Sequence, residues 1–169
     1  MQLKAVRIKN FRGYKNEVTI NIENLTVFVG KNDIGKSTVL ESLDIFFNDG
    51  KGVVKLDKED INKESCSEGE NNIYITAIFT DLPNEIILDE SNPTKFSEEY
   101  LLNKDGDLEI IKKYPNAGSA KVFIKAKHPT NPLCSELHTK KIADYRKIIK
   151  EYSIECKDHT KNAIMRKAI

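Results

Sequence analysis

Residues 28–47 read FVGKNDIGKSTVLESLDIFF, and this stretch decides the fold. Its core, residues 30–37, has the spacing G-x-x-x-x-G-K-[ST] of a phosphate-binding loop. The apolar run 25–29 precedes the loop, as expected of a strand buried on both faces of a sheet. After Lys36 the apolar residues recur at helical spacing until the segment 48–50 ends the helix. Strand, glycine loop and helix therefore follow in the order that a phosphate cradle needs.

The residues of the loop have separate tasks in holding a nucleotide. Gly30 and Gly35 permit backbone angles that turn successive amide N–H groups toward an anion at the helix N-terminus. The Lys36 ammonium group can reach the outer phosphates, and the Ser37 hydroxyl is placed to hold a magnesium ion. We predict that ATP and Mg²⁺ bind here; the alternative is a surface loop with a coincidental pattern. The predicted nucleotide-binding residues are Gly30, Lys31, Asn32, Asp33, Ile34, Gly35, Lys36, Ser37 and Thr38.

The first 47 residues also resemble a known family. The segment 8–12 (IKNFR), a short hairpin and a strand leading into Gly-x-Asn-x-x-Gly-Lys-Ser resemble the N-terminal ATP-binding region of RecF, SMC and OLD-type ATPases. These are ABC-like, AAA-type P-loop ATPases of chromosome maintenance, DNA repair and anti-phage defence. The resemblance implies an α/β fold of the P-loop nucleoside triphosphate hydrolase type, with this chain as the N-terminal half of an ABC-like head. Beyond residue 47 it is only general.

Two residues connect the resemblance with particular roles. In this family the basic residue of the Asn-Phe-Arg stretch lies near the nucleotide or the DNA, which makes Arg12 a candidate binding residue. The alternative is a solvent-facing arginine in a turn. Asp33 departs from the family pattern, which usually has glycine at that position, and this departure would stiffen the loop.

The resemblance further implies that two heads sandwich ATP, using a Ser-Gly-rich signature segment, a Walker B Asp-Glu pair and a late histidine. The sequence contains no signature segment. Residues 85–90 (EIILDE) imitate Walker B, so Asp89 and Glu90 are candidates to hold magnesium through water and to orient the attacking water. Their place in the chain, and the presence of Pro83 and Glu85, favour an edge strand or a loop instead.

The rest of the chain alternates between strand and helix patterns. Residues 57–72 are acidic and polar and indicate an exposed loop, and Asp105-Gly106 indicates a turn. A helix is predicted from residue 135 to about 152, with an apolar stripe that we interpret as a packing face rather than the start of a coiled coil. We expect a mixed sheet with the phosphate loop at a strand–helix junction, plus an antiparallel β lobe from the central strands. The predicted strands are 3–9, 18–22, 25–29, 73–80, 108–114 and 120–126.

Charge is distributed unevenly, although the net charge is only +1. Residues 1–56 carry +3, residues 57–120 carry −9 and residues 121–169 carry +7. The basic last third could face a nucleic acid or pair with the acidic middle. We divide the chain into an ATP-binding core at 1–56, an acidic loop with antiparallel strands at 57–134, and a basic helical segment at 135–169 that we expect to continue in a longer protein.

Composition narrows the class of protein. No apolar run approaches the roughly 20 residues that cross a bilayer, and the N-terminus has no hydrophobic block typical of a signal peptide. The three cysteines are widely spread, as suits reduced thiols, so we expect a cytoplasmic protein without a membrane partner. Cys134 with His138, and Cys156 with His159, have spacings compatible with zinc; the alternative is ordinary buried or solvated side chains.

The leading hypothesis is the ATP-binding portion of an ATPase that acts on DNA in repair, chromosome maintenance or anti-phage defence. ATP would close a homodimer or another head-to-head assembly. This chain alone should bind ATP and barely hydrolyse it, because no well-placed residue orients the attacking water unless Glu90 does. A second hypothesis is a regulatory module that binds nucleotide without cleaving it. A third is a self-contained P-loop hydrolase that uses Asp89 and Glu90.

Overall fold

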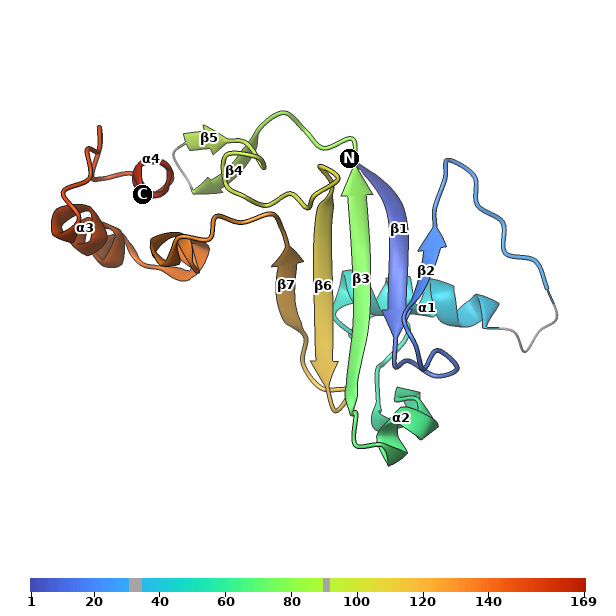
Figure 1. Ribbon diagram of the computed structural model, residues 1–169. Helices are drawn as coiled ribbons and strands as arrows, with labels where there is room; N and C mark the ends of the chain where they lie inside the picture. The colour runs from blue at the N-terminus through green and yellow to red at the C-terminus, as the bar shows by residue number, and fades with distance from the viewer. Residues whose placement is uncertain (31–34, 90–91) are drawn as a thin grey trace. The chain divides into compact units, whose positions relative to one another are not determined.

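The computed structural model of the chain describes residues 1–30, 35–89 and 92–169 (Figure 1). The chain separates into two compact units. The first, the sheet unit, comprises Met1–Leu82 and Asp107–Lys125. The second, the hairpin-helix unit, comprises Pro83–Gly106 and Ala126–Ile169. The phosphate-loop segment therefore belongs to the sheet unit, whereas Asp89 belongs to the hairpin-helix unit.

Five strands form the centre of the sheet unit, in the order β2-β1-β3-β6-β7. Every strand pair in this sheet is antiparallel. Each strand matches a predicted one to within one residue at either end, and the central strands extend the N-terminal sheet instead of forming a separate lobe. The strands are β1 (Gln2–Lys9), β2 (Val18–Asn21), β3 (Asn72–Thr80), β6 (Leu108–Pro115) and β7 (Lys121–Lys125).

Helix α1 (Lys36–Asn48) covers one face of this sheet and passes behind it in Figure 1. The rings of Phe47 and Phe79 lie 6.3 Å apart, and Tyr114 Oη donates a hydrogen bond to the Ile45 carbonyl over 3.2 Å. Side chains alternate along a strand, so a single set of positions turns toward the helix. The fully buried aliphatic residues of that set are Val6, Ile8, Ile73, Ile75 and Ala77. The core of the sheet unit lies between α1 and this face.

The apolar run 25–29 does not form the predicted strand. Leu25, Val27 and Val29 are 83%, 68% and 85% exposed. A strand needs a neighbouring backbone with which to share hydrogen bonds, and within the described part of the chain no strand pairs with this run. The prediction of a buried strand at residues 25–29 is therefore wrong.

The acidic segment 57–72 is largely exposed, as predicted, but it is folded into helical turns, so the prediction of a loop is wrong. It contains the 3-10 turn η1 (Lys58–Asp60) and the short helix α2 (Lys63–Ser67). The Asp60 side chain accepts a hydrogen bond from the Asp57 N–H over 3.0 Å and is only 12% exposed. Asp57 and Asp60 together cap the 3-10 turn η1.

In its described residues, the hairpin-helix unit contains a two-stranded antiparallel sheet and four short helical elements. Its core gathers around Tyr145, Ile149 and Met165, where α3 packs against α4. The elements are β4 (Ile86–Asp89), β5 (Asn92–Thr94), η2 (Pro132–Cys134), η3 (Leu137–Thr139), α3 (Ile142–Glu151) and α4 (Asn162–Ala168).

The helix predicted from residue 135 begins only at Ile142. A 3-10 turn occupies 137–139, and the Lys141 N–H donates to Asp144 Oδ2 over 2.9 Å, which fixes the helix start. Tyr145 and Ile149 are 1% and 3% exposed, so the interpretation of their stripe as a packing face is confirmed. The helices within the described ranges are all too short or too polar to cross a membrane. The three-part division at residues 56 and 134 stays a prediction.

Candidate nucleotide-binding site

The phosphate-loop pattern ends at the N-terminus of α1, where the sequence predicted the helix to begin. Gly35 is the N-cap residue, with φ 80°, a left-handed conformation that favours glycine. No side chain in the described ranges caps this end, so the first backbone N–H groups can meet an anion. Ser37 is exposed in the first turn, while Val39 begins the buried side of the helix.

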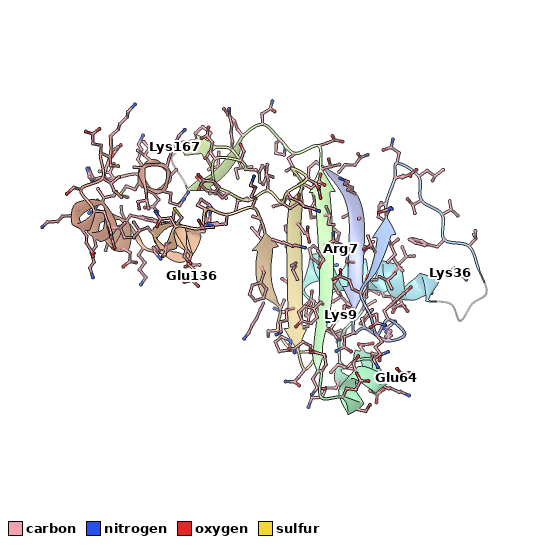
Figure 2. The ribbon with its side chains drawn as sticks, in the orientation of Figure 1. Arg7, Lys9, Lys36, Glu64, Glu136 and Lys167 are labelled. Carbon is pink, nitrogen blue, oxygen red and sulfur yellow. The ribbon has the colours of Figure 1, made fainter. Side chains whose placement is uncertain are left out.

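Lys36 connects the two ends of the loop. It is the first residue of α1, labelled in Figure 2, and its Nζ donates a hydrogen bond to the Gly30 carbonyl. The ammonium group therefore lies beside the backbone at the start of the loop. The predicted binding residues Lys31, Asn32, Asp33 and Ile34 lie outside the described residues.

Tyr14 holds the glycine at the end of the loop. Its Oη donates a hydrogen bond to the Gly35 carbonyl over 3.3 Å. A Cβ atom at Gly35 would come within 2.9 Å of the same Oη. The backbone conformation thus favours glycine at this position, and a larger residue would also have to displace the Tyr14 hydroxyl.

Arg12 links the connection between β1 and β2 to two other segments. Its Nε donates to Asp60 Oδ1 over 2.7 Å, and its Nη1 forms an ion pair with Glu41 of α1. The Arg12 N–H also donates to the Asp60 carbonyl over 2.7 Å. The pKa of Arg12 lies above its ordinary value: partial burial acts to lower it, but the hydrogen bonds to Asp60 and Glu41 outweigh that effect.

These contacts give Arg12 a structural role that neither sequence interpretation anticipated. Its side chain is 32% exposed and is tied to α1 one helical turn beyond Ser37, so it is not a simple surface arginine. A role beside nucleotide or DNA stays a prediction. Sequence reasoning also missed Tyr14, Glu41 and Asp60, and the only available signal was a cap pattern, Asp57-x-x-Asp60, at the start of η1.

The far end of α1 is fixed to β6. Lys112 Nζ donates to the Phe46 carbonyl over 2.7 Å and pairs with Asp49 Oδ1 at 2.5 Å. Burial raises the pKa of Tyr114, and the nearby Asp49 charge raises it further. Because contacts hold α1 at both ends, the helix N-terminus has a defined position relative to the sheet.

The Walker B candidates lie on a different kind of strand. Asp89 ends β4, which pairs only with β5 among the described strands, and Glu90 lies outside the described residues. Ile87 and Leu88 are 72% and 45% exposed. This placement agrees with an edge strand, and a catalytic role for either carboxylate stays a prediction.

The cysteine and histidine pairs have local partners. Cys134 is 8% exposed in the core of the hairpin-helix unit, and His138 Nε2 lies 2.9 Å from the Glu99 carbonyl oxygen. The Cys156 thiol donates to the Asp158 carbonyl over 3.4 Å. Across the described ranges no three His, Cys, Asp or Glu side chains gather as a metal site would require. The zinc alternative therefore gains no support.

The family of this chain follows from comparison with known proteins. Residues 1–169 match the family described as AAA ATPase domain. The chain belongs to that family. The match confirms the recognition of an AAA-type P-loop ATPase and the α/β P-loop fold class that followed from it. ATP binding is the shared property of an AAA ATPase domain, so the domain is a nucleotide-binding one.

The proteins similar to this AAA ATPase domain include a curated relative and a solved structure. An uncharacterized protein of Methanocaldococcus jannaschii is 35% identical over 112 residues, which are 66% of this chain and 31% of the relative. The matched part therefore makes up about a third of that longer protein. A solved structure from work on ATP-driven dimerization and DNA-stimulated activation of SMC ATPases has a TM-score of 0.48 and 14% identity, covering 89% of this chain and 92% of that one.

Proposed function

We propose that this AAA ATPase domain binds ATP with Mg²⁺ at residues 30–38. The observation that carries the proposal is the junction between the loop and α1, where a left-handed Gly35 precedes a helix N-terminus without a side-chain cap in the described ranges. Free N–H groups and the helix dipole attract an anion there, and Lys36 adds a positive charge. The exposed Ser37 hydroxyl is available to a hydrated magnesium ion.

The binding residues that we assign follow from this junction and from the sequence pattern. Gly35 fits because its left-handed conformation favours glycine and a larger side chain would displace Tyr14. Arg12 is assigned as a neighbour of the nucleotide or the DNA, reached through its link to α1. The assigned phosphate-binding residues are Gly30, Lys31, Asn32, Asp33, Ile34, Gly35, Lys36, Ser37 and Thr38, with Ser37 as magnesium ligand.

Calorimetric titration with ATP·Mg tests the site. Lys36→Ala should weaken binding more than about tenfold, or about 1.4 kcal/mol, because a charged contact to phosphate is lost. Lys63→Ala removes the same charge from the exposed surface of α2 and should leave the affinity unchanged. Equal affinities of wild type and Lys36→Ala would remove the phosphate-loop assignment.

We further propose that the chain supplies one half of an ABC-like head, and that a longer protein supplies the rest. The exposed apolar run 25–29 supports this, because its three aliphatic side chains need a covering surface. ATP hydrolysis needs a positioned water and charge neutralisation that the phosphate cradle alone does not provide. The 169-residue chain should therefore bind ATP with barely measurable phosphate release, and the full-length protein should turn over.

The alternative of a self-contained hydrolase depends on Asp89 and Glu90. Robust phosphate release from the 169-residue chain, abolished in Glu90→Gln, would establish that alternative and remove the half-head proposal. The exposure of β4 gives the alternative less support. A regulatory module that binds without cleaving is distinguished by full-length protein that binds ATP and never releases phosphate.

Action on DNA and ATP-driven pairing of heads are proposed from the resemblance of residues 1–47 to RecF, SMC and OLD-type ATPases. Two heads would close over ATP because the transition-state charge needs groups from the opposite head. Light scattering of the full-length protein should show a doubling of mass with ATP, and DNA should raise phosphate release. Neither effect should survive Lys36→Ala. Repair, chromosome maintenance and anti-phage defence are the processes in which we place this activity.

A further inference from the structure

The face of the five-stranded sheet opposite α1 carries an open groove. In β6 the residues Lys112 and Tyr114 contact α1, so Glu109, Ile111 and Lys113, which alternate with them, lie on the other face. The groove on that other face has a volume of about 650 Å³. It lies wholly within the sheet unit, along β1, β3, β6 and β7. Figure 2 labels Arg7 and Lys9 of β1, which contribute to it.

Positive charge predominates in this groove. Four basic side chains line it, namely Arg7, Lys9, Lys113 and Lys125, against the two carboxylates Glu17 and Glu109. Glu109, only 2% exposed, accepts from Arg7 Nη1 at 2.5 Å and lies 3.5 Å from Lys125 Nζ, so it fixes two of the cations on the face. A polyanion is the ligand that this charge balance favours.

Aromatic rings lie among these cations. The Lys9 and Lys113 ammonium groups each lie 5.5 Å from the centre of the Tyr74 ring, so two cations flank one ring. Phe123 of β7 is 50% exposed on the same face, beside Ile111. Glu70 is a neighbouring carboxylate whose pKa is lowered mainly by hydrogen bonds from Asn72, with smaller contributions from Lys9 and Lys113.

The exposed Phe123 ring lies within reach of the two lysines that flank Tyr74. Tyr74 pairs with Lys113 and Phe123 pairs with Ile111, so the rings are separated by one intervening strand and by two residues along the sheet. With strands about 4.8 Å apart and a rise of about 3.4 Å per residue, their Cα atoms lie roughly 12 Å apart. An unstacked base of a flexible strand can lie on Phe123 while a nearby phosphate of the same strand reaches the lysines beside Tyr74.

We propose that this sheet face binds a single strand of nucleic acid, with a base stacked on Phe123 and phosphates held by Lys9 and Lys113, whose ammonium groups are positioned by the Tyr74 ring between them. The proposal deepens the proposed action on DNA by naming a surface and a strand form. A duplex keeps its bases stacked inside and would leave the Phe123 ring unused. An acidic peptide would engage the lysines but has no planar base to stack on Phe123.

The test is fluorescence anisotropy with a labelled oligothymidylate about 15 nucleotides long, a length within the range of known single-strand sites. Lys9→Ala combined with Lys113→Ala should weaken binding and reduce the slope of log K against log salt by about 0.7 per lysine. Lys63→Ala combined with Lys104→Ala removes equal charge from exposed positions elsewhere and should leave both quantities unchanged.

The contribution of base stacking to binding is tested with a second pair of variants, one on each face of β7. Phe123→Ala should weaken binding about tenfold through lost stacking, and Phe123→Trp should restore it. Val122→Ala truncates a side chain that is at least as exposed, on the opposite face of the same strand, and should have no effect.

The outcomes separate this proposal from the proposed function. Wild-type chain that binds ATP·Mg but no oligothymidylate overturns the nucleic-acid face and leaves the nucleotide site intact. Oligothymidylate binding that is insensitive to Lys9, Lys113 and Phe123 substitutions overturns the face and leaves the action on DNA intact. Tighter binding of blunt duplex or of polyglutamate, with the same sensitivity to these substitutions, assigns the face to another ligand class and overturns the single-strand proposal.

Discussion

Two apolar runs of almost the same composition have opposite positions in this molecule. Residues 75–79 of β3 read ITAIF and are between 0% and 7% exposed. Residues 25–29 read LTVFV, yet Leu25, Val27 and Val29 are more than half exposed. β3 is hydrogen-bonded to β1 on one side and β6 on the other, whereas the described chain offers the run 25–29 no strand partner. Composition makes a strand possible, and a neighbouring backbone makes it form.

The difference bears directly on the half-head proposal. The run 25–29 leads into the phosphate loop, so its position decides how firmly the loop is supported from the N-terminal side. In this chain the support comes instead from α1 and from Tyr14 at Gly35. A longer protein that covers Leu25, Val27 and Val29 would add a second support to the same loop.

The largest expected effect is a stability difference between the two runs. Ile75→Ala should lower the free energy of unfolding by about 2–5 kcal/mol, because Ile75 is fully buried beneath α1 and the substitution leaves a cavity. Val27→Ala should change it by less than about 0.5 kcal/mol, because Val27 is 68% exposed. Urea unfolding followed by circular dichroism measures both.

The milder Ile75→Val sharpens this test, with an expected loss of about 0.5–1.5 kcal/mol. A loss above about 2 kcal/mol for Val27→Ala would mean that the run 25–29 is packed in solution, and the contrast between the two runs would disappear. In the full-length protein, the same Val27→Ala should become costly if the half-head proposal holds.

The second effect concerns the end of the phosphate loop. Gly35→Ala should cost about 1–3 kcal/mol, because a left-handed φ of 80° strains any other residue and the new Cβ meets Tyr14 Oη. Gly69→Ala, with φ 87° and open space, reports the backbone strain alone, and Gly13→Ala, with neither feature, should be close to neutral. Thermal or urea unfolding of the three variants gives the comparison.

The excess of Gly35→Ala over Gly69→Ala isolates the contact with Tyr14. If the two variants lose equal stability, Tyr14 does not restrain the loop. ATP·Mg affinity should also fall in Gly35→Ala and remain unchanged in Gly13→Ala, which ties the same contact to the nucleotide site.

Local sequence signals were sufficient to predict an element where the residues that begin and end it lie within the same segment. The glycine loop and the segment 48–50 delimit α1, and alternation placed the strands of the sheet. Local sequence signals failed for the run 25–29, because whether it forms a strand depends on a neighbouring strand. They also failed for the segment 57–72, whose charge was interpreted as the sign of a solvated loop, although Asp57 and Asp60 cap a turn.

The contacts of the candidate site were beyond the reach of sequence patterns for a different reason. Tyr14 and Gly35 are 21 residues apart, and Arg12 and Asp60 are 48 apart. Periodicity describes one element at a time and carries no information on which distant side chains meet. The phosphate-loop residues themselves were predictable, because their pattern is set by the ligand rather than by tertiary packing.

The smallest expected effect is the pH dependence of stability contributed by Tyr114, which lies in the buried core of the sheet unit. Its hydroxyl is held against the Ile45 carbonyl at 3.2 Å, and burial, aided by the Asp49 charge, raises its pKa above the ordinary value of about 10. The unfolded chain therefore loses this proton first as the pH rises. The contribution to stability is complete below pH about 10 and falls by about 1.4 kcal/mol per pH unit above it, until the folded-state pKa is passed.

Tyr114→Phe isolates that contribution, because every other titrating group is shared with the wild type. The variant should lose about 1 kcal/mol at pH 8, where the hydrogen bond to Ile45 is missing, and the deficit should shrink as the pH rises from 10 to 11. Urea unfolding at a series of pH values measures the difference. Parallel pH profiles for the two proteins would mean that Tyr114 ionises as readily in the folded chain as in the unfolded one. The hydroxyl would then be open to water, and the close packing of the C-terminal end of α1 on β6 would have to be abandoned.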